Sequence, residues 1–139
     1  MSRVFTNALG LDVGMVRIGV ARINFIARIS EPLVVLQNDA SFLQKLGDLV
    51  IEHSADLIVV GLPRNMSGQT TKQTELVVDF VKNLSGADLP ELVYQDETLS
   101  SVAADARLTK KTAHMQDAVA AAIILEDFLQ TNITDITGK

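Results

Sequence analysis

The sequence predicts an α/β domain of three layers, in which helices cover both faces of a five-stranded mixed sheet. Residues up to about 36 hold three alternating, strand-like segments with short connections, as in an antiparallel meander. Helical patterns then alternate with apolar runs of strand length, which is typical of parallel strands joined by helices. The chain has 139 residues, of which 47% are hydrophobic, enough for one compact domain with its own core.

Period-two patterns define the first three strands. Gly14 can turn the chain after the first of them, and the short connections make the three strands antiparallel neighbours. We expect the first strand to lie at the centre of the sheet. The predicted segments are Ala8–Val13, Arg17–Asn24 and Glu31–Leu36.

The next two elements are a helix and a buried strand. Apolar positions between Ser41 and His53 follow helical spacing, with Asp39 or Ser41 available as a cap. The run Leu57–Val60 is continuously apolar, which indicates a strand covered on both faces, and we expect it to stop at Gly61-Leu62-Pro63.

The remaining chain is predicted to add three helices and one strand. The helices show apolar stripes or cap residues, and the strand is a short β-favouring run. The elements are a helix opened by a Thr70/Gln73 capping box and ended by Gly86, a strand over Leu92–Gln95, a short helix from Ser100 or Ser101 through Leu108, and a last helix over Gln116–Gln130.

Composition excludes several kinds of site. Cysteine is absent, so disulfides, thiolate zinc sites and a cysteine nucleophile are excluded, and two histidines are too few for an imidazole-rich metal site. The longest apolar run, Ala118–Leu125, is too short to span a membrane, and we expect a cytoplasmic protein. Residues 1–139 are interpreted as one domain, with a core over about 5–130 and a frayed tail over about 131–139.

The net charge and the local charge distribution give different indications of whether the protein binds nucleic acid. A net charge of −5 argues against binding through the overall field of the protein. Two local basic groups are compatible with a phosphate-binding face, although charge alone favours a solvated surface. These groups are Arg3, Arg17, Arg22 and Arg28, and Arg107, Lys110, Lys111 and His114.

Two acidic residues are predicted to meet at the centre of the fold. Period two places Asp12 on the same face of its strand as Ala8 and Gly10, where small residues leave room for a helix. Asp117 heads the apolar face of the last helix, so a helix lying on that face brings the two carboxylates together. Repulsion and lost hydration would be relieved by a hard divalent cation, Mg²⁺ or Mn²⁺.

A third carboxylate is expected at the end of the fifth strand. Asp96 and Glu97 point to opposite sides, and Glu97 is the preferred third ligand. Other interpretations remain open at this point. Asp117 can be an ordinary residue favoured by the helix dipole, and Asp96-Glu97 can be a solvated loop. Asp12, inside an apolar strand, is harder to explain without a partner.

The loop from Gly61 to Gly68 precedes a helix, where backbone N–H groups can hold an anion. Its spacing matches neither a Walker loop nor a dinucleotide fingerprint, so phosphate contact is only an expectation here, and Gly68 can simply permit the turn.

The ordered set of motifs resembles the YqgF family, the RuvX-type proteins similar to Holliday-junction resolvases. Each motif is loose, but together they occur in the family's order over residues 8–129. The matching segments are Leu9-Gly10-Leu11-Asp12-Val13-Gly14, Arg17-Ile18-Gly19-Val20-Ala21, Val59-Val60-Gly61-Leu62-Pro63 with Asn65 and Gly68, Asp96-Glu97-Thr98-Leu99-Ser100-Ser101, and Asp117 before Ala120-Ala121.

This resemblance implies a ribonuclease H-like fold and a bacterial nuclease that matures the 5′ end of pre-16S rRNA. The family's acidic positions fall on Asp12, Glu97 and Asp117, as catalytic residues and ligands of Mg²⁺ or Mn²⁺. Substrate-binding roles are assigned to Arg17, Arg64 and Asn65. The sequence departs from the family pattern at positions that bear on substrate choice, namely Arg64, Thr98, Ser101 and Met115-Gln116.

The sequence therefore predicts a metal-dependent nuclease acting on RNA, with precursor rRNA as its expected partner and branched DNA as the alternative. A non-catalytic nucleic-acid-binding assembly factor is a second alternative. A sugar kinase of the same superfold is disfavoured, because the chain is too short for a second lobe. Whether the protein is a monomer or a weak dimer stays open.

Overall fold

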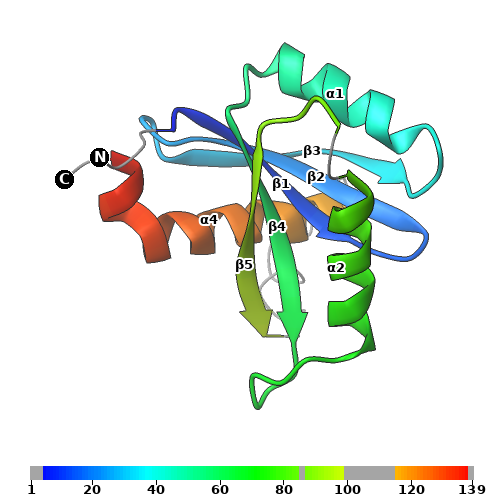
Figure 1. The fold of residues 1–139 in the computed structure, drawn as a ribbon. Coiled ribbons are helices and arrows are strands. Elements are labelled where there is room, and N and C mark those ends of the chain that lie inside the picture. Colours follow the sequence, from blue (N-terminus) through cyan, green and yellow to red (C-terminus); the bar gives the residue numbers. More distant parts are fainter. Residues whose placement is uncertain (1–4, 85–86, 99–114, 138–139) are drawn as a thin grey trace.

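The computed structural model describes residues 5–84, 87–98 and 115–137 (Figure 1). Five strands form one sheet in the order β3-β2-β1-β4-β5. The first three are antiparallel, and β4 and β5 run parallel to β1, so the predicted mixed sheet with the first strand at its centre is confirmed. The strands are β1 (Asn7–Val13), β2 (Arg17–Asn24), β3 (Ile29–Gln37), β4 (Leu57–Arg64) and β5 (Glu91–Thr98).

Helices cover both faces of the sheet, as the three-layer prediction requires. Side chains of α1 (Phe42–Glu52) and α2 (Lys72–Leu84) share one core cluster with the sheet. Those of α4 (Gln116–Thr137) share a second cluster on the opposite face. Figure 1 shows α4 running across the strands, and its helical backbone is interrupted at Asn132.

The alternation along β1 decides which helix covers which side chain. Leu9, Leu11 and Val13 lie in the cluster with α1 and α2, whereas Ala8 lies in the cluster with α4. Asp12 follows the same alternation as Ala8, and its side chain therefore faces α4. The sheet face expected for this carboxylate is the one observed.

Three glycines on adjacent strands allow α4 to approach the sheet. A Cβ at Gly19 of β2 would collide with the main-chain oxygen of Asp117, and one at Gly10 of β1 would lie 2.9 Å from that of Ala121. A Cβ at Gly61 of β4 would collide with the side chain of Ile124. We call Gly19, Gly10 and Gly61 the glycine track. They lie on β2, β1 and β4, and α4 packs closely over them because they lack side chains.

The prediction that the fourth strand stops at Gly61-Leu62-Pro63 is wrong, because β4 continues to Arg64. Beyond Val60, β4 no longer pairs with β1 and is bonded only to β5. It behaves as an edge strand there, so the missing N–H of Pro63 is tolerated. The longer strand also brings Asp96 and Glu97 into β5, and the solvated-loop interpretation of these two residues is wrong as well.

The start of α2 also differs from the prediction of a Thr70/Gln73 capping box. The Thr71 amide donates to Thr74 Oγ1 at 2.9 Å, and the Thr74 amide donates to Thr71 Oγ1 at 3.3 Å. The reciprocal bonds lie one residue later because Thr74 is buried and its hydroxyl also donates to the Pro63 carbonyl.

Several predictions lie outside the described residues. These are the short helix from Ser100 or Ser101 through Leu108, the helix end at Gly86, Arg3, and the basic group Arg107, Lys110, Lys111 and His114. Among the described residues, no helix combines the length and apolar character needed to cross a membrane.

Candidate functional site

The central acidic residue is Asp12, at the carboxyl end of β1. Its carboxyl group is largely buried beneath α4. Burial raises the pKa of Asp12 to about 6, and the neighbouring charge of Asp117 adds to the increase. A carboxylate that is both desolvated and next to a like charge is a favourable place for a cation.

Asp117 reaches this position because the first turn of α4 lies directly over Gly19. One carboxylate oxygen also accepts a hydrogen bond from Arg17, with 3.1 Å between Nε and Oδ2. The Asp117 carboxylate therefore has two charged neighbours, the carboxyl group of Asp12 and the guanidinium of Arg17. It also lies at the helix N-terminus, where a negative charge is favoured by the helix dipole.

Glu97 lies near the end of β5 and is hydrogen-bonded with Asp127 of α4. Burial raises the pKa of Glu97 to about 8, together with this hydrogen bond and the charges of Asp127, Asp12 and Asp96. Two carboxyl groups in contact are compatible only if a proton or another cation lies between them.

Asp127 was missed by sequence reasoning. It lies ten, seven and three residues after Asp117, Ala120 and Ile124, so helical spacing puts it on the sheet-facing side of the helix, and this spacing is the signal that could have found it.

The structure thus brings the three predicted carboxylates into one electrostatic neighbourhood. Asp12 lies near Asp117, Glu97 contacts Asp127, and the charge of Asp12 acts on Glu97. No group of three acidic or histidine side chains within the described residues is close enough together to hold a metal ion as the side chains stand. The single three-carboxylate metal site therefore stays a prediction.

The donor chemistry of this neighbourhood fits a hard divalent cation. Its acids offer carboxylate oxygens without thiolates, the combination that Mg²⁺ and Mn²⁺ prefer. Repulsion among Asp12, Asp117 and Glu97 is the physical reason why a cation would stabilise the arrangement.

Arg64, at the end of β4, lies beside Asp96, with 3.1 Å between Nε and Oδ1. The contact is an ion pair without hydrogen-bond geometry at Nε, and that atom is buried. A phosphate oxygen would therefore have to bind the remaining N–H groups of the guanidinium. Arg17 thus lies next to an acidic residue of the candidate site, whereas Arg64 pairs with Asp96, the neighbour of Glu97 whose side chain points to the opposite side of β5.

Asn65 organises the loop between β4 and α2. Its side-chain oxygen accepts hydrogen bonds from the amides of Ser67 and Gln69, each at 2.9 Å. These two amides are therefore already bonded, and the expectation that free amides of this loop hold an anion does not apply to them. Gly68 has a φ of +78°, which explains a glycine at that position.

The comparison with known families matches residues 6–131 to the family described as "RuvX: Holliday junction resolvase". The chain belongs to the RuvX family. Its relatives include proteins from Paraburkholderia phymatum, 40% identical over 87% of this chain and 83% of that protein, and from Sulfurihydrogenibium sp., 34% identical over 93% and 90%. Both carry the provisional name of pre-16S rRNA nuclease.

The fold of this RuvX-family chain is also that of a solved resolvase. The crystal structure of the fowlpox virus Holliday junction resolvase covers 91% of this chain and 99% of its own, with a TM-score of 0.54 and 9% identity. At that identity the likeness concerns the fold alone, and it agrees with the ribonuclease H-like architecture expected from the motifs.

Proposed function

We propose that this protein is a metal-dependent nuclease that hydrolyses phosphodiester bonds in RNA, and that it acts in the cytoplasm in the maturation of the 5′ end of pre-16S rRNA. The observation that carries the proposal is the juxtaposition of Asp12 and Asp117. They come from opposite ends of the chain, and they lie close enough that the charge of one raises the pKa of the other. The names of the relatives support RNA as the substrate.

Each residue has a distinct part in the proposed mechanism. Asp12, Glu97 and Asp117 would hold one or two Mg²⁺ or Mn²⁺ ions. When bound, such ions activate water and stabilise the leaving oxygen of the phosphodiester. Glu97 must first separate from Asp127, since the hydrogen bond between them occupies its carboxyl group.

The two arginines are assigned to the phosphates of the substrate. Arg17 is well exposed, and the guanidinium of Arg64 forms an ion pair with the exposed Asp96. Arg17 can donate to phosphate oxygens once Asp117 is occupied by a cation, and Arg64 can do so by exchanging the exposed Asp96 carboxylate for a phosphate. Asn65 contributes by holding the conformation of the loop that follows Arg64.

The decisive experiment is cleavage of precursor rRNA, linear RNA and a four-way DNA junction, each with Mg²⁺, Mn²⁺ or chelator. Asp12→Asn should keep the fold and abolish cleavage. Asp48→Asn, which removes the same charge from an exposed position on α1, is the matched control and should cut normally. Metal-dependent cleavage by Asp12→Asn at the wild-type rate would refute the assignment.

A second candidate is a nuclease of branched DNA, favoured by the family's description. Paired cuts in a junction generally require a two-fold dimer, so preferential cleavage of the four-way junction by a stable dimer would support it over RNA processing. A non-catalytic binding protein would instead bind RNA equally well in chelator and with Asp12→Asn.

A further inference from the structure

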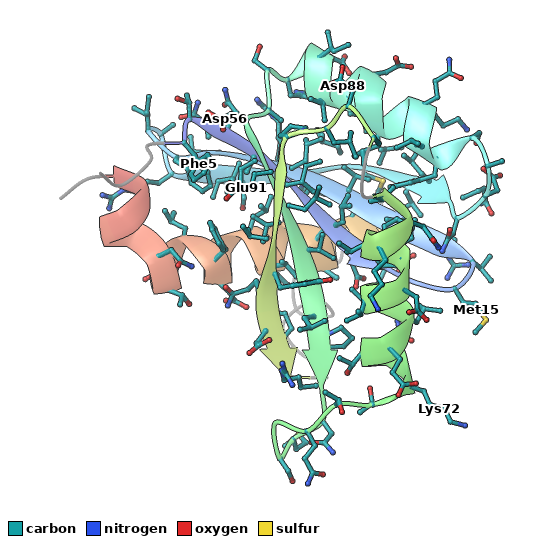
Figure 2. All side chains as sticks on the ribbon, in the orientation of Figure 1. Phe5, Met15, Asp56, Lys72, Asp88 and Glu91 are labelled. Carbon is teal, nitrogen blue, oxygen red and sulfur yellow. The ribbon has the colours of Figure 1, made fainter. Side chains whose placement is uncertain are left out.

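The turn between β1 and β2 exposes two adjacent apolar side chains. Met15 is 77% exposed and Val16 is 62% exposed. Figure 2 shows Met15 projecting from this turn, away from the body of the protein. We refer to these two residues as the apolar tip. Because neither side chain is buried within the fold, their apolar surface is available to another molecule.

The backbone beneath the apolar tip is held from three directions. The Gly14 amide donates to the Arg17 carbonyl at 2.9 Å, which closes the turn. Asn38, after β3, donates from its side chain to the Gly14 carbonyl and from its amide to the Val16 carbonyl, each at 2.8 Å. The Gln73 side chain of α2 donates to the Val13 carbonyl at 3.0 Å.

These hydrogen bonds hold the backbone of the apolar tip in one conformation. A surface that is already ordered loses little conformational entropy on binding, so even a small apolar contact can contribute to affinity. The tip thus has the properties of a preformed contact point.

The apolar tip is also continuous with the candidate site. Met15 follows Asp12 by three residues, so their Cα atoms lie within about 10 Å of each other. Arg17, directly after the tip, pairs with Asp117. A strand whose phosphate lies at the carboxylates therefore has its neighbouring nucleotides within reach of the tip.

Charge indicates which kind of nucleic acid suits this surface. The protein carries a net charge of −5, and both arginines next to the site are paired with acids, so binding through phosphates alone would be weak. Unpaired bases expose apolar faces that can pack on such side chains, whereas a duplex hides those faces in its stack.

We propose that Met15 and Val16 bind an unpaired nucleobase next to the scissile phosphate, which makes single-stranded segments the preferred substrate. This inference rests on the proposed function for the position of the strand. It adds a specificity contact that does not itself take part in hydrolysis.

The test is binding in chelator, where no cleavage occurs, measured by fluorescence anisotropy. The ligands are a single-stranded RNA and the same RNA in a fully paired duplex. The double variant Met15→Ser/Val16→Ser should lose affinity for the single strand on the order of fivefold to tenfold, with no change for the duplex. The matched control, Ile26→Ser/Ile51→Ser, removes two apolar side chains that are 80% and 79% exposed away from the site, and should bind both ligands normally.

Met15→Gln, which keeps the length of the side chain, provides a second and milder variant with an expected intermediate loss. Equal losses for both ligands, or no loss, would overturn the proposal. So would sedimentation showing that the tip variant converts a dimer into a monomer, since the tip would then be covered by a second copy. Tip-dependent binding of the single strand without any metal-dependent cleavage would support binding of an unpaired base at the tip while refuting the nuclease assignment and the position next to a scissile phosphate.

Discussion

Arg17 and Asp117 are 100 residues apart in the sequence, and the Arg17 Nε atom lies 3.1 Å from Asp117 Oδ2. The pair joins the start of β2 to the first turn of α4. The guanidinium group of Arg17 thus binds Asp117, an acid that the proposed mechanism assigns as a metal ligand. Exposed pairs of this kind stabilise a fold little, so its main consequences should concern binding.

Arg17→Ala is expected to weaken binding of single-stranded RNA and to reduce the slope of log K against log salt by about 0.7, the value for one lost phosphate contact. The free energy of unfolding should change by less than about 1 kcal/mol. Arg22→Ala is the control, because Arg22 lies on the same strand and pairs with Glu31 instead. An equal change of slope in both variants would remove Arg17 from the phosphate-binding role.

Gly19→Ala should destabilise the protein by about 1–3 kcal/mol, because the added Cβ would push the first turn of α4 off β2. Gly47→Ala is the control. A Cβ at Gly47, within α1, meets nothing within 4 Å, and alanine there should stabilise by about 0.5–1 kcal/mol. Urea unfolding measures both changes. Equal stability of the two variants would contradict the close approach of α4.

Stability in chelator should fall as the pH rises. Asp12 has its pKa raised from 3.8 to about 6, and Glu97 from 4.5 to about 8. The folded protein therefore holds protons that the unfolded chain releases, so the contribution of these groups is complete below about pH 4 and is lost as the pH passes each raised pKa. Thermal unfolding between pH 5 and pH 9 measures this loss, and Mg²⁺ should offset it at the alkaline end. A flat profile would contradict the raised values.

Asp12→Asn should remove part of this alkaline loss. In chelator at about pH 8 the variant is expected to be more stable than the parent by about 1–2 kcal/mol, because a desolvated charge beside Asp117 is gone. At about pH 4 the two proteins should unfold alike. Urea titrations at both pH values provide the comparison, and a variant less stable than the parent at pH 8 would argue that Asp12 serves the fold instead.

Asp56→Ala should destabilise the fold at the amino ends of the central strands β1 and β4, away from the candidate site, without affecting cleavage. The Asp56 carboxylate accepts hydrogen bonds from the amides of Thr6 and Asn7, at 2.9 and 3.3 Å. Losing this acceptor should cost about 1–3 kcal/mol in the free energy of unfolding. Activity assayed below the unfolding transition should match the parent, and a specific loss of activity there would count against confining the site to the carboxyl ends of the strands.

Sequence reasoning worked where side-chain periodicity carries the information. The alternation along β1 correctly placed Asp12 beneath the last helix, and the small residues beside it correctly indicated a close helix. The end of β4 could not be predicted, because the tolerance for Pro63 depends on where pairing with β1 stops.

Contacts between distant segments were the other limit. Nothing in the spacing of α4 indicates that Asp127 meets Glu97, since that contact depends on the angle at which the helix crosses the sheet. The two arginine–acid pairs depend likewise on tertiary geometry.

The packing of α4 over the glycine track affects when, during synthesis, the protein gains all the carboxylates of the candidate site. Two of the four neighbouring carboxylates, Asp117 and Asp127, belong to α4, the same helix that closes the core over Gly10 and Gly61. During synthesis these acids leave the ribosome after all five strands, so a nascent chain can pair its strands before it has both acids of α4. On the proposed function, hydrolysis is thereby withheld until α4 has docked, and a nascent chain without α4 cannot cut the RNA around it.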